Sequence, residues 1–80
     1  SGYSEQSRTQ LPAGFIANPH AYDVADYRIG ATYEGRKYVY FVRYVRTAQG
    51  YYTVMSWTMP SYLDDNEKKL HGILASFQEL

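Results

Sequence analysis

The sequence predicts an α+β fold: an antiparallel three- to four-stranded β-meander with one C-terminal α-helix packed on one face. Apolar side chains alternate with a period of two from about residue 24 to residue 59, which is typical of strands. Turn sequences around Gly35 and Gly50 divide this region into consecutive hairpins. After Pro60 the apolar spacing changes to that of a helix.

The N-terminal part of the chain is the least strand-like. Tyr3 is the only large apolar residue among residues 1–10, so this segment is predicted to be a disordered tail, with residues 11–80 forming a single domain. Residues 11–19 are more apolar but contain two prolines and a glycine. They are therefore expected to form an edge strand or an extended lead-in.

Three strands are expected, at residues 24–33, 37–47 and 51–59. The middle one is apolar on both parities, as in the central strand of a sheet. We expect the helix to cover the aliphatic parity, because tyrosine hydroxyls need water or a hydrogen-bond partner. Arg43 lies on that parity and must then reach the rim or pair with an acid such as Asp26 or Glu34. The covered parity holds Val39, Phe41 and Val45, and the other holds Tyr38, Tyr40, Val42 and Tyr44.

The C-terminal helix is predicted to run from about Ser61 to Phe77. Ser61 and Asp64 have the spacing of a capping box. Gly72 falls on the exposed side, where it weakens the helix. The side that faces the sheet is predicted to bury Leu70, Ile73, Leu74 and Phe77.

Catalysis is not predicted, and neither is a metal ion or another cofactor. The 80 residues contain no cysteine and two histidines, so a thiolate nucleophile is excluded and a zinc site would need carboxylates. Asp64, Asp65 and Glu67 are explained by their favourable place at a helix N-terminus. His20 and His71 lack the neighbours of a catalytic base, and no phosphate-binding glycine motif is present.

Nucleic-acid binding is a weaker alternative. The chain has no net charge, but residues 28–50 hold five basic residues against one acidic residue. The strand around residues 36–44 interleaves basic and aromatic residues, as in sheets that stack nucleobases on exposed rings. It lacks the glycine between the basic and aromatic positions of that strand motif.

Four segments resemble the C-terminal half of the Mog1/PsbP-like fold. They are Leu11-Pro12-Ala13, Gly35-Arg36-Lys37-Tyr38, Tyr51-Tyr52-Thr53-Val54 and Ile73-Leu74-Ala75-Ser76-Phe77. The resemblance covers about seven-eighths of the chain, from Leu11 to Leu80, and a complete domain of that family is longer. It implies a non-enzymatic binding or assembly module, often outside the cytoplasm, and carries over no catalytic residue.

The function predicted from the sequence is therefore protein interaction or assembly in a bacterial envelope or secreted protein, through a tyrosine-rich sheet face. The expected partner is another protein or a second copy in a homodimer, and no membrane-spanning segment is expected. The alternative is binding of single-stranded nucleic acid or another anionic ligand, and a cytoplasmic location stays open. The predicted binding residues are Tyr38, Tyr40, Tyr44, Arg28, Arg43 and Arg46.

Overall fold

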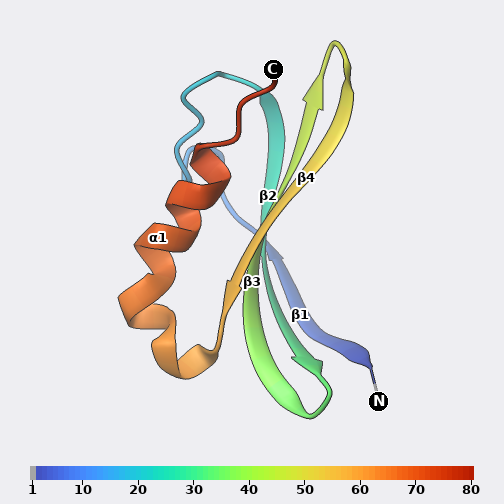
Figure 1. Ribbon diagram of the computed structural model, residues 1–80, viewed down its shortest axis with the longest axis vertical. Helices are drawn as coiled ribbons and strands as arrows, with labels where there is room; N and C mark the ends of the chain where they lie inside the picture. Colours follow the sequence, from blue (N-terminus) through green and yellow to red (C-terminus); the bar gives the residue numbers. More distant parts are fainter. Residues whose placement is uncertain (1) are drawn as a thin grey trace.

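A computed structural model describes residues 2–80 and confirms the α+β fold (Figure 1). Strands β1 (Tyr3–Gln10), β2 (Asp23–Tyr33), β3 (Arg36–Thr47) and β4 (Gly50–Thr58) form one antiparallel sheet. Their order in the sheet is their order in the chain, so the sheet is a meander. A 3₁₀ turn, η1 (Pro60–Tyr62), leads into the single helix α1 (Leu63–Ala75), which packs against the sheet.

The prediction that residues 1–10 form a disordered tail is wrong for the described part of this segment, because β1 pairs with β2 along its whole length. Its side chains are all exposed, so it is held by backbone pairing and by polar contacts. The Ser7 Oγ accepts a hydrogen bond from the Gly30 N–H at 3.2 Å, and the Thr32 hydroxyl donates to Gln6 at 3.0 Å. Residues 11–22 form no strand and cross the sheet as an extended loop, the lead-in loop.

The β2–β3 hairpin fixes which side chains share a face. Glu34 and Gly35 form its two-residue turn with φ angles of 50° and 82°, which is the left-handed backbone of a type I′ turn. The register then places Ile29 opposite Tyr40 and Arg28 opposite Phe41. Directly opposed residues of antiparallel strands point to the same face. Odd residues of β2 therefore share a face with even residues of β3.

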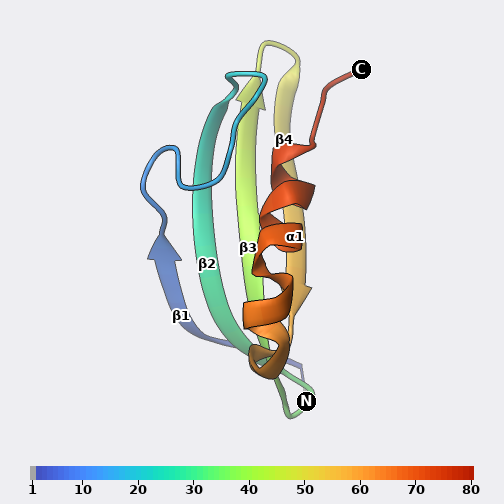
Figure 2. The same ribbon diagram turned by 90° about the vertical axis from the view of Figure 1, so that its left-hand side faces the viewer.

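The helix covers the aliphatic face of β3 and β4, as predicted from the sequence; we call it the covered face. Figure 2 shows α1 lying over β4 and part of β3, while the lead-in loop crosses the upper part of β2 and β3. The core between them is formed by Ile16 of the loop, Val39 and Phe41 of β3, and Leu70 and Leu74 of α1.

Arg43 lies on the covered face and forms an ion pair with Asp26, one of the two acidic residues that were expected as its partner. Its Nε and Nη2 atoms donate to the two Asp26 carboxylate oxygens at 2.7 and 2.9 Å, and both side chains are buried. The Nη1 and Nη2 atoms also donate to the carbonyl oxygens of Ala17 and Ile16, at 2.8 and 3.0 Å. One guanidinium thus fastens the lead-in loop to the sheet.

The helix departs from prediction in three details. The residue that caps α1 is Tyr62, and no side chain caps the helix N-terminus, so the predicted capping box of Ser61 and Asp64 is absent. Ile73 is 48% exposed rather than buried. Phe77 lies beyond the end of α1, half-buried against the rings of Tyr22 and Tyr52.

Candidate functional site

The sheet face opposite the helix, which we call the open face, is covered by no other described element (Figure 1). It gathers side chains from all four strands, and eight of them are aromatic. The aromatic residues of the open face are Tyr3, Tyr27, Tyr33, Tyr38, Tyr40, Tyr44, Tyr51 and Trp57.

A small apolar core lies at the centre of the open face. Ile29, Ala31 and Val42 are buried there, and Tyr27 and Tyr40 pack against them. Because no helix covers them, the surrounding aromatic rings keep water from this group. Tyrosine suits this position since its ring is apolar and its hydroxyl can stay in water.

Arg8 of β1 contacts two of the tyrosines that surround this core, Tyr27 and Tyr44. Its Nε and Nη2 atoms donate to the Glu5 carboxylate at 3.0 and 2.9 Å, and its Nη1 donates to the Tyr44 hydroxyl at 3.2 Å. Its guanidinium carbon lies 5.4 Å from the centre of the Tyr27 ring, within range of a cation–π contact. The hydrogen bond from Arg8 holds the pKa of the Glu5 carboxyl below its usual value.

One end of the open face is hollowed. The aromatic hollow has a volume of about 530 Å³ and a mostly apolar lining. Its rings are inclined to one another rather than coplanar: the Tyr40 ring centre lies 6.1 Å from those of both Tyr3 and Trp57, at interplanar angles of 66° and 41°. Burial and the nearby Glu5 raise the pKa of Tyr3 above its ordinary value. The lining residues are Tyr3, Tyr33, Tyr38, Tyr40, Met55 and Trp57.

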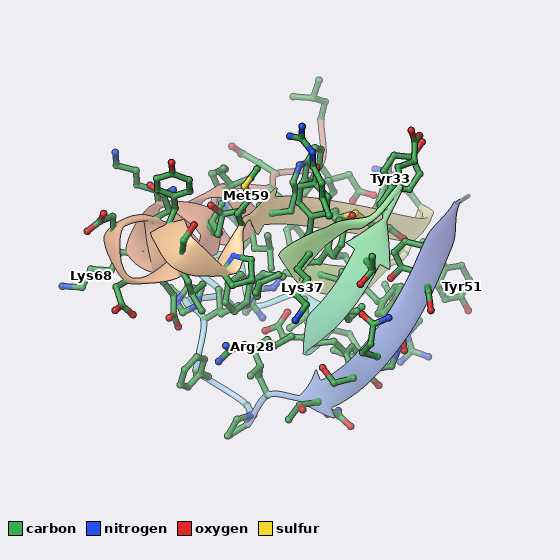
Figure 3. All side chains as sticks on the ribbon, turned by 90° about the horizontal axis from the view of Figure 1, so that it is seen from below. Arg28, Tyr33, Lys37, Tyr51, Met59 and Lys68 are labelled. Atoms are coloured by element: carbon green, nitrogen blue, oxygen red, sulfur yellow. The ribbon has the colours of Figure 1, made fainter. Side chains whose placement is uncertain are left out.

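The other end of the open face carries a projecting side chain. Tyr51, near the start of β4, is 82% exposed and points away from the sheet on the side opposite α1 (Figure 3). Trp57, which lines the hollow, lies six residues further along the same strand and on the same face. At the rise of a strand this separation is about 20 Å.

The structure divides the six predicted binding residues. Tyr38, Tyr40 and Tyr44 lie together on the open face. Arg46 is on that face too, but it forms an exposed ion pair with Asp23.

Two of the predicted binding residues do not lie on the open face. Arg28 points to the covered face, opposite Phe41, as Figure 3 also shows, and Arg43 is buried in its pair with Asp26. The prediction that the three arginines bind together on the tyrosine-rich face is therefore wrong. Their positions along the strands could have predicted this result, since Arg28 and Arg43 alternate with residues whose side chains lie on the open face.

Sequence reasoning missed Tyr3, Arg8, Tyr33, Met55 and Trp57 as members of the site. Met55 and Trp57 share the parity of Tyr51, so strand alternation could have included them. Tyr3 and Arg8 could not be found in this way, because β1 has no apolar alternation.

The other residues considered for chemistry lie on α1 or in the lead-in loop, away from the open face. His71 is enclosed by the rings of Phe15 and Phe41, and its Nε2 lies 3.3 Å from Glu67 without the alignment of a hydrogen bond. Within residues 2–80, no group of three potential metal ligands comes together. No helix in the described part of the chain has both the length and the apolar character needed to cross a membrane.

Comparisons with protein-family models, curated proteins and solved structures find no match to this chain. The resemblance to the Mog1/PsbP-like fold stays a prediction from the sequence.

Proposed function

We propose that this chain is a protein-assembly module that associates with a second copy of itself through the open face. The observation that carries the proposal is that this face has both a projecting ring, Tyr51, and an aromatic hollow of matching chemistry. In a two-fold dimer each contact occurs twice, because residue i of one copy meets residue j of the other and the reverse. Tyr51 of each copy can then enter the hollow of its partner.

The size of the open face fits such a contact. Four strands of about ten residues cover roughly 600 Å², from the usual strand spacing and rise. Two such faces packed together remove about 1,200 Å² from water, which is the lower limit for specific protein interfaces. Aromatic residues and methionine are also the types that are enriched at the centres of interfaces.

The charges of the open face favour a protein partner over nucleic acid. Arg8 forms an ion pair with Glu5, and Arg46 forms one with Asp23. The remaining basic residue of this face is Arg36, which lies at the rim and takes part in none of the ion pairs of residues 2–80. A binder of single-stranded nucleic acid needs a basic groove that follows the phosphates. An envelope or secreted location, which the resemblance implies, is part of the same proposal.

The test is sedimentation equilibrium with matched tyrosine variants. We expect the parent chain to form a reversible dimer and Tyr51→Ser to be a monomer with an unchanged far-ultraviolet circular dichroism spectrum. Tyr62→Ser is the control, because Tyr62 is 55% exposed but belongs to η1 beside the helix. A parent chain that stays monomeric at all concentrations overturns the proposal, as does equal loss of association in both variants.

A mixing experiment tests the two-fold geometry. Met55→Lys places a charged side chain in the hollow and is expected to be monomeric. A mixed dimer of Met55→Lys with Tyr51→Ser retains one intact contact between Tyr51 and the hollow, whereas either variant alone retains none. Mixing should therefore restore part of the association, and no recovery would contradict this arrangement.

Salt dependence separates the nucleic-acid alternative. A fluorescent single-stranded oligonucleotide serves as the probe. Binding that weakens steeply with rising salt would favour a phosphate-binding surface. Self-association through apolar contacts should change little over the same range.

A further inference from the structure

The backbone of β4 has an unpaired outer edge. The Leu11 N–H donates to the Asp26 carbonyl at 2.9 Å and the Glu34 N–H donates to the Gly2 carbonyl at 3.2 Å, so even residues of β2 direct their backbone groups to β1. Because these directions alternate along antiparallel strands, even residues of β4 must face β3 and odd residues must face outward. No strand among residues 2–80 lies beyond β4. The outward residues are Tyr51, Thr53, Met55 and Trp57.

This edge has none of the features that keep strands from pairing with other chains. Soluble proteins protect edge strands with charged residues, proline or bulges. The nine residues of β4 include no charged residue and no proline, and they are rich in aromatic and β-branched side chains. The opposite edge is different, because β1 has a bulge between Glu5 and Ser7 and carries the charges of Glu5 and Arg8.

A flank of α1 that carries one exposed apolar side chain, Ile73, lies beside the same edge. His71 faces β3, since its ring centre is 4.8 Å from that of Phe41. At 100° per residue, Ile73 projects from the opposite flank of the helix, on the same side as Asn66. The Asn66 side-chain amide donates a hydrogen bond to the Thr58 hydroxyl of β4, so this flank lies on the β4 side. Figure 2 shows α1 lying over β4, so this flank stands above the outer edge. Ile73 is 48% exposed and Lys69 is exposed beside it.

We propose that the outer edge of β4 binds an extended segment of a partner protein as a fifth strand. This function goes beyond self-association through the open face, because it uses the backbone of one edge. The segment would exchange hydrogen bonds with Thr53 and Met55 and place alternate apolar side chains against Ile73, with an acidic residue near Lys69. A second copy's β4 does not fit, because it would bring its own α1 into the same space.

Hydrogen exchange and a peptide library test this proposal together. Without a partner, the amides of Thr53 and Met55 should exchange faster than those of Val54 and Ser56. A displayed library of randomised nine-residue segments, selected on the immobilised chain, should enrich sequences that alternate apolar and polar residues and contain no proline. Binding of the enriched peptide should slow exchange at Thr53 and Met55.

The variants separate backbone pairing from side-chain contact. Thr53→Pro removes an outward N–H while leaving the pairing with β3, and should weaken binding of the enriched peptide by about tenfold or more. Thr53→Val keeps the N–H and should bind normally. Gln10→Pro makes the same change on the outer edge of β1 and should also bind normally.

A peptide methylated at alternate backbone nitrogens tests the pairing without altering the protein. It should fail to bind when the methyl groups face β4, so the proposal can be tested even if Thr53→Pro does not fold. Failure to enrich any sequence overturns the proposal, as does equal binding by Thr53→Pro or by the methylated peptide. Loss of binding in Tyr51→Ser alone would instead place the peptide on the open face.

Discussion

Arg43 and Arg8 each bind a carboxylate through two nitrogen atoms, but they do so on opposite faces of the same sheet. The Arg43–Asp26 pair is buried beneath the lead-in loop, and the guanidinium also binds two backbone carbonyls. The Arg8–Glu5 pair lies at the surface among tyrosine rings. The two pairs have the same chemistry, so the difference in burial decides their roles: the first pair contributes to the stability of the fold, and the second orders side chains at the surface.

The largest expected effect comes from the apolar core of the covered face. Phe41→Ala should cost about 3–5 kcal/mol, because the ring is fully buried beneath α1. This loss is comparable with the whole stability of a small domain, so circular dichroism should show an unfolded chain. Tyr51→Ser on the open face should stay folded in the same measurement, and equal melting of Phe41→Ala and the parent would show that α1 does not dock on the sheet.

The two ion pairs can be compared directly. Asp26→Ala leaves the guanidinium of Arg43 buried without its counter-charge and should lower the free energy of unfolding by about 3–5 kcal/mol. Glu5→Ala removes the matching carboxylate at the surface and should leave the melting temperature near that of the parent. Denaturant unfolding of both variants checks this difference. Similar losses would mean that burial does not separate the two pairs.

A substitution where β1 contacts β2 should have a smaller effect on the stability of the domain. A Cβ at Gly30 would lie 2.7 Å from the Ser7 Oγ, so Gly30→Ala must push β1 away or displace the hydroxyl. We expect a loss of about 1 kcal/mol, or roughly 4–8 °C in melting temperature for a domain of this size. Adding Ser7→Ala removes the obstructing oxygen and should recover part of the loss. No recovery in the double variant would contradict this contact.

The smallest expected effect is a pH dependence at the C-terminal segment. The Tyr52 hydroxyl donates a 2.7 Å hydrogen bond to Glu79, which raises the pKa of Tyr52 above its ordinary value. The stabilisation is therefore present below about pH 10 and is lost as the pH rises through the folded-state pKa. Unfolding measured between neutral and alkaline pH should show a steeper loss for the parent than for Tyr52→Phe. Parallel curves would show that the bond does not contribute.

Much of the sheet and the helix could be predicted from the sequence. The two-residue alternation from β2 to β4 and the change of period after Pro60 are set by which side chains must be buried, and the covered parity of β3 follows from the same requirement. The structure confirms that α1 packs on the side of Phe41. Ile73 departs from prediction because α1 lies over the edge strand, and no further strand of residues 2–80 lies beyond β4 to cover this side chain.

β1 could not be predicted from burial because all its side chains are exposed. Its pairing depends on backbone groups of β2 and on local matches such as that of Ser7 with Gly30, which leave no periodic signal. The tyrosines of β2, β3 and β4 were predictable from parity, but the arginines were assigned by their closeness in sequence. Residues close in sequence on a strand alternate between faces, so charge has to be counted for each face separately.

The meander order of the strands bears on how the chain folds. Every strand pairs with strands next to it in the sequence, so the sheet can grow from the β2–β3 hairpin without a long loop being closed first. Formation of such a hairpin takes microseconds, and a turn of the Glu34-Gly35 type favours it. The lead-in loop is held by Arg43, which is itself paired with Asp26 across that hairpin. We therefore expect the loop to close over the sheet only after the hairpin has formed.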